Sequence, residues 1–340
     1  MKVAHFHFGK EGGAERFFVH LVNSLHERDI EQISVIRPNR LWRKDIEGAT
    51  QIIESNFRNL SPDRLMLPIK VKRLANEWEP NTLFAWMPRA CRLMPNYKKC
   101  IRIARLGDYP LRLDYFKNID VLVCNTPGIA EHVRNLGWTR GVEMISNFTY
   151  AEPATPVSRA DVNTPEDAFV VTSMGRFVPR KGFDVLIRAM SLNPDMYLWI
   201  AGDGEEADNL KTLANSLGVM DRIRFLGWQK NPNAYVAASD VFAAASSHEP
   251  LGNIVLEAWA QRVPVVSTKS EGPSWFMTHE QDGLMVEIGD ADGFAAAFNR
   301  LRSEQGLGKK LIEGGLTTLD EKFSKRVITD AYINLFQRKP

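Results

Sequence analysis

The sequence has 340 residues, of which 44% are hydrophobic and 25% are charged, and its formal net charge is +2. A chain of this length and hydrophobic content predicts a folded protein with two domains of ordinary size. Its three cysteines include no C-x-x-C pair, which argues against a disulfide framework or a zinc site and favours a reducing compartment.

No signal peptide precedes the first apolar run, and no run reaches the roughly 20 residues that a membrane-spanning helix needs. We therefore expect a cytoplasmic protein. Any contact with a membrane would be peripheral, at the inner face of the cytoplasmic membrane.

Short apolar runs alternate with longer segments of helical period, a pattern typical of βα units and a parallel sheet. In the first half, this pattern predicts strands at residues 3–8, 33–36, 82–86 and 121–125 and a helix at 14–28. The second half predicts strands at residues 169–174, 196–201, 223–226, 241–244 and 263–267. Helices are predicted between them at residues 183–191, 208–217, 232–238 and 254–261, with a last amphipathic stretch at 324–337.

The pattern predicts an α/β protein with two Rossmann-like, doubly wound domains. We expect an N-terminal domain at residues 1–150 and a proline-containing linker at 151–166. A C-terminal domain is expected at 167–320. The end of the chain, residues 321–340, is expected to form a helix that packs back on the N-terminal domain.

Glycines follow several predicted strands, at the edge of the sheet where open α/β proteins bind ligands. Gly12 and Gly13 open the first helix, where their backbone N–H groups can approach an anion closely, although the full G-x-G-x-x-G spacing is absent. Residues 175–182 (GRFVPRKG) place Arg176 and Lys181 beside a helix start. Such cations can neutralise the charge that develops on a departing diphosphate.

The most informative segment is residues 246–258 (SSHEPLGNIVLEA), in which Glu249 and Glu257 stand eight residues apart. Between them, Gly252 and Asn253 can leave backbone N–H groups free at a helix N-terminus. One site would then combine an anion cradle with carboxylates that accept hydrogen bonds from hydroxyl groups. A sugar nucleotide needs this combination.

As an ordered set, these motifs resemble the retaining glycosyltransferases of family 4, which have the GT-B fold with two domains facing a central cleft. The resemblance implies that Arg176 and Lys181 grip the donor diphosphate, and that Glu249 holds hydroxyl groups of the donor sugar. The positions that the resemblance assigns to donor binding are Gly12, Gly13, Gly202, Gly204, Leu226, Pro250, Leu251, Gly252, Asn253 and Glu257, the last at the ribose. It also implies that the domain at residues 1–150 binds the acceptor and the domain at 167–320 binds the nucleotide sugar. It implies no metal and no cofactor besides the nucleotide diphosphate sugar as co-substrate.

One departure from the family pattern concerns a histidine that many members have in a segment like Thr-x-His-Gly. The corresponding residues 103–109 (IARLGDY) contain none. A branch similar to bacterial lipopolysaccharide-core and surface-polysaccharide transferases has Arg-Leu-Gly at this place. The resemblance therefore adds Arg105 and Asp108 to Arg176, Lys181 and Glu249 as the expected catalytic set.

The charges are distributed unevenly, because residues 1–150 carry 23 Lys and Arg against 16 Asp and Glu. Ten of these basic residues lie between positions 70 and 112, where only three acidic residues accompany them. Two interpretations stay open: an anionic partner, such as a glycan, a glycolipid or the membrane surface, or an ordinary solvated face. No nucleic acid is expected as a partner.

Three weaker signals receive structural explanations. Asp290 and Asp292 have D-x-D spacing, but a helical run follows and predicts a helix start. His5 and His7 share a face of the first strand without a visible acidic or cysteine partner, so we expect no metal there. The apolar residues around Trp86 and Met94 are expected inside the N-terminal domain rather than in a membrane wedge.

The resemblance implies a hexosyltransferase that retains the anomeric configuration and acts in lipopolysaccharide core or surface polysaccharide biosynthesis. Two alternatives stay open: a sugar-nucleotide epimerase of the same architecture, and a non-catalytic subunit that binds nucleotide sugars. The fold alone does not decide among them. Mass spectrometry would, because only a transferase makes a product larger than either substrate.

Overall fold

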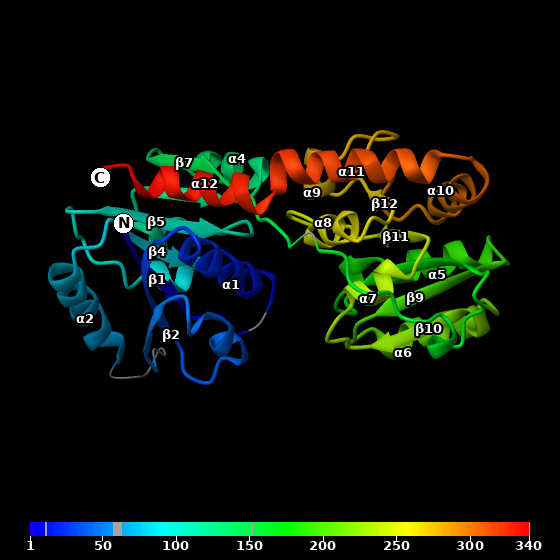
Figure 1. The fold of residues 1–340 in the computed structure, drawn as a ribbon, viewed down its shortest axis with the longest axis horizontal. Helices are drawn as coiled ribbons and strands as arrows, with labels where there is room; N and C mark the ends of the chain where they lie inside the picture. Colours follow the sequence, from blue (N-terminus) through cyan, green and yellow to red (C-terminus); the bar gives the residue numbers. More distant parts are fainter. Residues whose placement is uncertain (11, 57–62, 151, 340) are drawn as a thin grey trace. The chain divides into compact units, whose positions relative to one another are not determined.

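The computed structural model describes residues 1–10, 12–56, 63–150 and 152–339. The chain divides into two compact units, which Figure 1 shows as ribbons. The N-terminal unit comprises Met1–Phe148 and Lys325–Pro340, and the C-terminal unit comprises Thr149–Ser324. Position 151, where the expected linker begins, lies outside the described residues.

In the described residues, the N-terminal unit is built on a seven-stranded parallel sheet with the order β3-β2-β1-β4-β5-β6-β7. The strands are β1 (Lys2–His7), β2 (Glu31–Ile36), β3 (Gln51–Glu54), β4 (Thr82–Trp86), β5 (Ile101–Leu106), β6 (Val121–Cys124) and β7 (Gly141–Met144). The helices are α1 (Gly13–His26), α2 (Asp63–Trp78), α3 (Met87–Cys91), α4 (Pro127–Asn135) and α12 (Lys325–Phe336), with 3-10 turns η1 (Leu41–Ile46) and η2 (Asp114–Phe116).

Helices cover both faces of this sheet, so its central strands are buried on two sides, as parallel strands require. Residues from α2, α3 and α4 pack in one cluster with apolar side chains such as Ala104 and Leu122. Residues from α1 and α12 pack on the opposite face with Phe84, Trp86 and Ile103. Trp86 is 1% exposed and Met94 is 2% exposed, which confirms that these side chains are internal.

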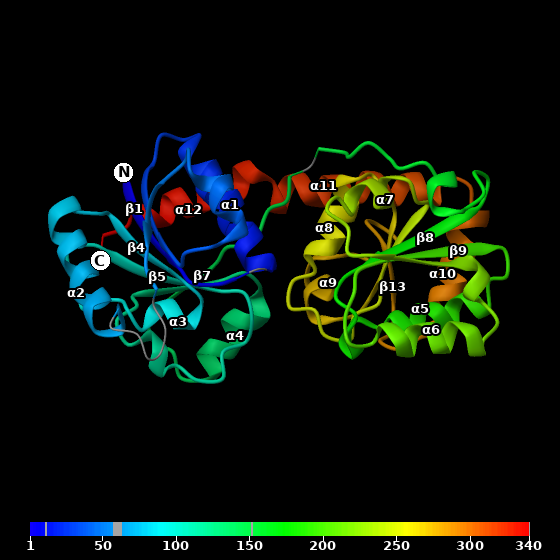
Figure 2. The ribbon, with the colours of Figure 1, turned by 90° about the horizontal axis from the view of Figure 1, so that it is seen from below.

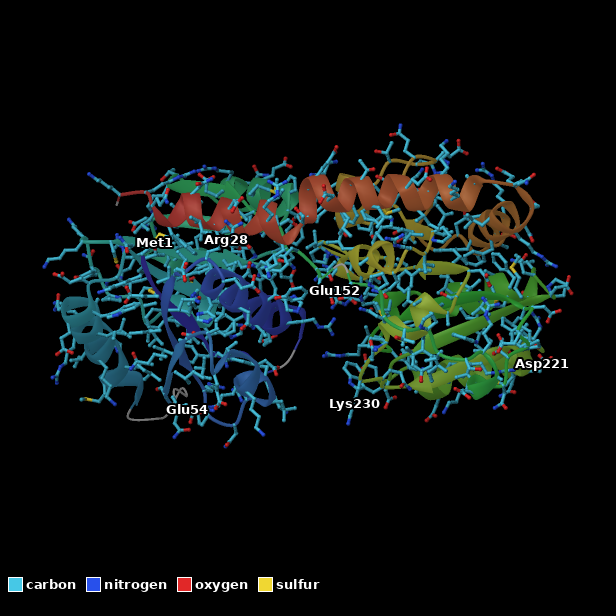
Figure 3. The ribbon with its side chains drawn as sticks, viewed as in Figure 1. Met1, Arg28, Glu54, Glu152, Asp221 and Lys230 are labelled. Carbon is cyan, nitrogen blue, oxygen red and sulfur yellow. The ribbon has the colours of Figure 1, made fainter. Side chains whose placement is uncertain are left out.

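The helix α12 belongs to the N-terminal unit although the whole C-terminal unit precedes it in the sequence. Its residues Ile328, Tyr332, Leu335 and Phe336 are at most 4% exposed, in the cluster that contains Phe17 and Phe84. At its polar edge, Asp330 forms an ion pair with Arg28, 3.0 Å apart, and Figure 3 labels Arg28 beside this helix. The last helix therefore completes a core that the first 148 residues leave open.

The C-terminal unit has, in the described residues, a six-stranded parallel sheet with the order β10-β9-β8-β11-β12-β13. The strands are β8 (Phe169–Met174), β9 (Met196–Ala201), β10 (Ile223–Gly227), β11 (Val241–Ala244), β12 (Val265–Thr268) and β13 (Leu284–Val286). The helices are α5 (Phe183–Ser191), α6 (Ala207–Ser216), α7 (Asn233–Ala237), α8 (Asn253–Ala260), α9 (Glu271–Phe276), α10 (Ala291–Ser303) and α11 (Leu307–Phe323). The 3-10 turns are η3 (Ala160–Val162), η4 (Pro179–Lys181) and η5 (Met220–Arg222).

Two apolar clusters lie on opposite faces of this second sheet. Helices α5, α6 and α10 supply most of one cluster, together with Leu311 of α11, and α8, α9 and the rest of α11 supply the other. Figure 2 shows the ribbon of these helices. The two doubly wound parallel sheets confirm the predicted fold class. The segment before β8 also packs here, because Val157 and Val162 contact the cluster of Val170 and Trp199.

Side-chain caps explain where two of the helices begin. The Thr126 hydroxyl accepts a hydrogen bond from Ile129 N–H at the start of α4. Asp290 Oδ1 accepts one from Gly293 N–H, 2.8 Å away, at the start of α10. The prediction that the D-x-D pattern marks a helix start is therefore confirmed.

Candidate functional site

The strand order of the C-terminal unit defines where loops converge. β8 and β11 are neighbours, but the chain leaves β8 toward β9 and leaves β11 toward β12, on the other side. Ligands of open α/β sheets bind at such a switch point, beyond the carboxyl ends of the strands. Residues 175–182 follow β8 and residues 245–252 follow β11, so the two loops predicted to bind the donor meet here.

Close packing joins these loops. Ser247 N–H donates a hydrogen bond to Arg180 O, 2.8 Å away. Gly182 has a φ of +65°, and a Cβ there would stand 2.1 Å from Ala245 O. Only glycine therefore fits this position, for its conformation and for the space available.

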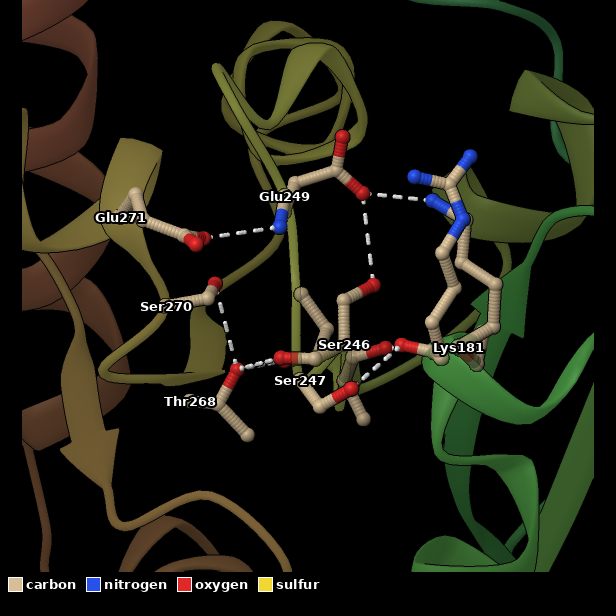
Figure 4. A network of polar contacts seen from close by, with 11 residues as sticks. Lys181, Ser246, Ser247, Glu249, Thr268, Ser270 and Glu271 are labelled. Atoms are coloured by element: carbon tan, nitrogen blue, oxygen red, sulfur yellow. Dashed lines mark hydrogen bonds and ion pairs between the residues drawn. The ribbon is translucent and has the colours of Figure 1, made fainter. Parts of the chain in front are cut away.

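Lys181 and Glu249 form an ion pair at this junction, although 68 residues separate them in the sequence. Lys181 Nζ donates to Glu249 Oε2 over 2.5 Å, and the Ser246 hydroxyl donates to the same oxygen over 3.3 Å (Figure 4). The two charged side chains are only 15% and 19% exposed. A cation and a carboxylate thus share one partly buried place, where an entering diphosphate could compete for the lysine.

The backbone of Glu249 is held by the start of α9. Glu271 Oε2 accepts a hydrogen bond from Glu249 N–H at 3.1 Å, and Gly272 N–H donates to Glu249 O at 2.9 Å. The other Glu271 oxygen contacts His248 Nδ1 at 2.8 Å. Partial burial opposes ionisation of Glu271, but these hydrogen bonds outweigh it and keep its pKa below the usual range.

Sequence reasoning included His248 only as a member of segment 246–258 and missed Glu271, which holds this loop from the start of α9. Glu271 has ordinary surroundings in the sequence, and the 22 residues between Glu249 and Glu271 carry no periodic signal that links them. Only the packing of α9 against the loop shows the connection.

Glu257 lies on α8, which begins after Gly252. That glycine has a φ of +90°, and a Cβ added to it would lie 3.3 Å from the ring of Pro273. Asn253 starts the helix, whereas Pro250 and Leu251 belong to the loop before it. Glu257, which the resemblance assigns to the ribose of the donor, is 8% exposed.

The remaining glycines of this unit bring loops together. A Cβ on Gly202 would stand 1.9 Å from Gly175 O, and one on Gly204 would stand 2.4 Å from Phe177 O. The loop that contains Arg176 therefore rests directly on these two glycines. Leu226 is partly buried on the edge strand β10. Residues 176 and 178–181 line an open cavity of about 560 Å³, which the cations of this loop make positive.

The predicted residues of the N-terminal unit occupy two different environments. Gly12 and Gly13 are exposed at the start of α1, and the Glu15 carboxylate is buried beside them. Asp108 is exposed, and its Oδ1 accepts a hydrogen bond from Tyr109 N–H at 2.8 Å. Arg105 is 2% exposed, and its guanidinium packs 4.7 Å from the ring centre of Phe17.

The basic stretch between residues 70 and 112 is not entirely a surface feature. Arg102 Nη2 lies 2.6 Å from Asp120 Oδ1, and its Nε donates to Oδ2 at 2.9 Å. Arg102 is 8% exposed. Arg102 and Arg105 therefore do not belong to the predicted basic surface, because both side chains are buried within the N-terminal unit.

His5 and His7 are fully buried at the carboxyl end of β1. Burial lowers the pKa of His5 to about 4 and that of His7 to about 3, so both rings are neutral at physiological pH. His5 Nε2 contacts Gln32 Oε1 at 3.0 Å, and its Nδ1 accepts from Trp86. Within the described ranges, no three His, Cys, Asp or Glu side chains gather as metal ligands, and no helix is long and apolar enough to span a membrane.

Two doubly wound parallel-sheet units, one of them with cationic and carboxylate loops at its switch point, define a protein of the GT-B fold. HepE from Anabaena, solved with UDP and glucose, superposes with a TM-score of 0.81 at 19% identity, covering 98% of this chain and 99% of that one.

Residues 155–317 match the family of glycosyl transferases group 1. Over 340 residues the chain is 59% identical to LpsE, a lipopolysaccharide core biosynthesis glycosyltransferase of Rhizobium meliloti (strain 1021), covering 100% of both chains. It is 53% identical over 338 residues to LpsD, another such enzyme of that organism, covering 99% of this chain and 98% of that one. The chain belongs to the group 1 glycosyl transferases and is homologous to enzymes of lipopolysaccharide core biosynthesis.

Proposed function

We propose that the protein transfers a hexose from a nucleoside diphosphate donor to an anionic glycan or glycolipid in the assembly of the lipopolysaccharide core. The observation that carries the donor site is the Lys181–Glu249 pair at the switch point of the C-terminal sheet. The similarity to LpsE and LpsD supports the acceptor class. The UDP and glucose bound by HepE support the donor class.

The proposed reaction retains the anomeric configuration. The bond between the sugar carbon and the diphosphate oxygen breaks, and the acceptor oxygen bonds to that carbon from the same face. The acceptor proton passes to the departing diphosphate. Lys181 and Arg176 stabilise the charge that develops there, and Glu249 accepts hydrogen bonds from sugar hydroxyl groups.

A donor screen tests this proposal. UDP, GDP and ADP are each added to the full-length protein, and the shift in Tm is measured, because a ligand stabilises the state that binds it. We expect one nucleotide to raise Tm more than the other two at equal concentration. Incubation of the corresponding nucleotide sugar with lipopolysaccharide core oligosaccharide should then yield a heavier product by mass spectrometry. An isomerised donor without transfer would instead identify an epimerase, and no product would identify a non-catalytic subunit.

We expect transfer to continue unchanged in excess EDTA. The cations of Arg176 and Lys181 supply the positive charge that a divalent ion provides in other transferases, so no metal is required at the diphosphate. The rate is measured after extensive dialysis against EDTA and again after addition of Mg²⁺ or Mn²⁺. Loss of activity that either metal restores would contradict metal independence.

We further propose that the N-terminal unit contacts the anionic inner face of the cytoplasmic membrane, where a glycolipid acceptor would be found. On α2, Met66 and Ile69 are 48% and 62% exposed, and Lys70 and Arg73 are exposed beside them. Positions 66, 69, 70 and 73 share one face of a helix. Apolar side chains mixed with cations on one face suit an anionic lipid surface.

The double variant Lys70→Glu/Arg73→Glu should bind vesicles of anionic phospholipid at least about tenfold more weakly, since each cation near such a surface contributes about 1 kcal/mol. Sedimentation with vesicles measures the partition coefficient at low and high salt, which screens the attraction. Lys309→Glu/Lys310→Glu on α11 reverses two charges that are also exposed and serves as the matched control. Equal binding by both double variants would return the α2 face to the status of a solvated surface.

A further inference from the structure

Arg105 carries a buried charge that the protein itself does not compensate. The Arg105 side chain extends from β5 into the interior, where its Nη2 donates a hydrogen bond to Asn147 Oδ1. Its guanidinium also lies over the rings of Phe17 and Trp86. Among the residues that the structure describes, Arg105 forms no ion pair with a carboxylate, and its Nε has no hydrogen-bond partner. A buried charge without a counter-ion destabilises the fold, because removing it from water is costly and no partner compensates that cost.

The ionisable neighbours do not provide a counter-ion. Burial raises the pKa of the Tyr332 phenol to about 12 and that of the Cys124 thiol to about 12, so both are neutral at physiological pH. Burial also lowers the pKa of Arg105, but a guanidinium remains protonated in proteins. The positive charge therefore persists without a negative partner.

The guanidinium of Arg105 lies next to Gly107, a residue at the surface. Gly107 is exposed and directly follows β5. The point where a Cβ would stand on Gly107 is 3.2 Å from Arg105 Nη1 and 3.8 Å from Asn125 Nδ2. Asn125 follows the neighbouring strand β6, is 3% exposed, and its Oδ1 makes no hydrogen bond. Donor groups of two buried residues thus lie within 4 Å of the position that a Gly107 side chain would take, at the carboxyl edge of a parallel sheet, where ligands of α/β folds bind.

We propose that the space at this position is an oxyanion pocket, in which Arg105 and Asn125 bind one phosphate or carboxylate group of a substrate. The proposal rests on the proposed transfer reaction, which offers two sources of such a group. One is the diphosphate of the donor, and the other is an acidic group of the acceptor. A planar guanidinium with paired N–H donors suits either oxyanion.

The pocket also gives a reason for glycine at position 107. Its backbone φ lies outside the left-handed region, so the conformation itself does not require glycine. A side chain there would occupy the space in front of Nη1. Glycine at this position leaves that side of Nη1 unobstructed.

Gly107→Ala tests the pocket with one added methyl group. We measure the rise in Tm caused by inorganic phosphate at constant ionic strength, with chloride as the reference. The rise should fall by at least half in Gly107→Ala relative to the wild type. Gly48→Ala is the matched control, because a Cβ there meets no atom within 4 Å and its backbone is equally permissive. Its phosphate response should equal that of the wild type.

Arg105→Met removes the charge and keeps most of the side-chain volume. In the absence of phosphate, its Tm should equal or exceed that of the wild type, because an apolar replacement removes the cost of the uncompensated charge. Its phosphate response should match that of Gly107→Ala. A lower Tm with an unchanged phosphate response would show that Arg105 only supports the fold.

Two further measurements identify the source of the anion. If the donor supplies the anion, Gly107→Ala and Arg105→Met should each bind UDP, or whichever nucleotide the donor screen selects, at least tenfold more weakly. If the acceptor supplies it, nucleotide affinity should be unchanged and the KM for core oligosaccharide should rise at least tenfold. An equal phosphate response in all four proteins would overturn the pocket while nucleotide binding, and with it the proposed function, could still hold. Absence of any nucleotide binding to the wild type would instead overturn the proposed donor.

Discussion

Replacement of Glu249 by glutamine should lower kcat/KM for sugar transfer by about 10- to 100-fold, with little change in Tm. Hydrogen bonds to a charged group contribute about 1.5–3 kcal/mol, and each factor of ten in rate corresponds to about 1.4 kcal/mol. The amide keeps the shape of the side chain but loses the charge that attracts Lys181 and strengthens bonds to sugar hydroxyl groups. Steady-state kinetics with the donor varied, together with a thermal melt, measure both quantities.

The matched control is Glu287→Gln, which removes the charge of an exposed glutamate that pairs with Lys269 elsewhere in the same unit. Its kcat/KM should stay close to that of the wild type. Glu257 would be a less specific target, because its 8% exposure means that a substitution also changes the packing of α8. Normal kinetics in Glu249→Gln would exclude Glu249 from the donor site.

Truncation of the chain after Ser324 should prevent the N-terminal unit from folding stably. The deletion removes Ile328, Tyr332, Leu335 and Phe336, all buried against α1 and the sheet. Burial of four such side chains contributes about 6–12 kcal/mol at about 1.5–3 kcal/mol each. This sum is comparable to the whole stability of a typical domain, about 5–15 kcal/mol. Limited proteolysis should then digest the first 148 residues much faster than the C-terminal unit.

A point variant makes the same test without removing the helix. Leu335→Ala should lower the free energy of unfolding by about 2–5 kcal/mol, the range for a buried leucine. Asn334→Ala, at the exposed neighbouring position on α12, should stay within about 0.5 kcal/mol of the wild type. Urea unfolding measures both. Equal stability of the two variants would mean that α12 does not contribute to the core of the N-terminal unit.

Local patterns in the sequence predicted much of the fold, because a buried parallel strand and an amphipathic helix each have a period that a few residues reveal. The strands β1, β4, β8 and β9 appear as short apolar runs, and the start of α10 appears as a capping aspartate. The order of motifs around Arg176 and Glu249 likewise sufficed to suggest a sugar-nucleotide enzyme.

The strand β5 escaped prediction because two arginines interrupt its apolar pattern. Arg102 is tolerated there because Asp120, 18 residues later, neutralises it, and no local period records that partnership. Arg105 is buried without a carboxylate partner. No sequence pattern predicts that such a charged residue lies in the core.

Sequence position alone also could not show which distant residues share a place. Glu271 holds the Glu249 backbone across 22 residues, Lys181 meets Glu249 across 68, and α12 returns to the N-terminal core after the entire C-terminal unit. Propensity and period act over a few residues along the chain. Hydrogen bonds, ion pairs and apolar contacts depend on distance in space, so the strand order and helix packing decide which side chains meet.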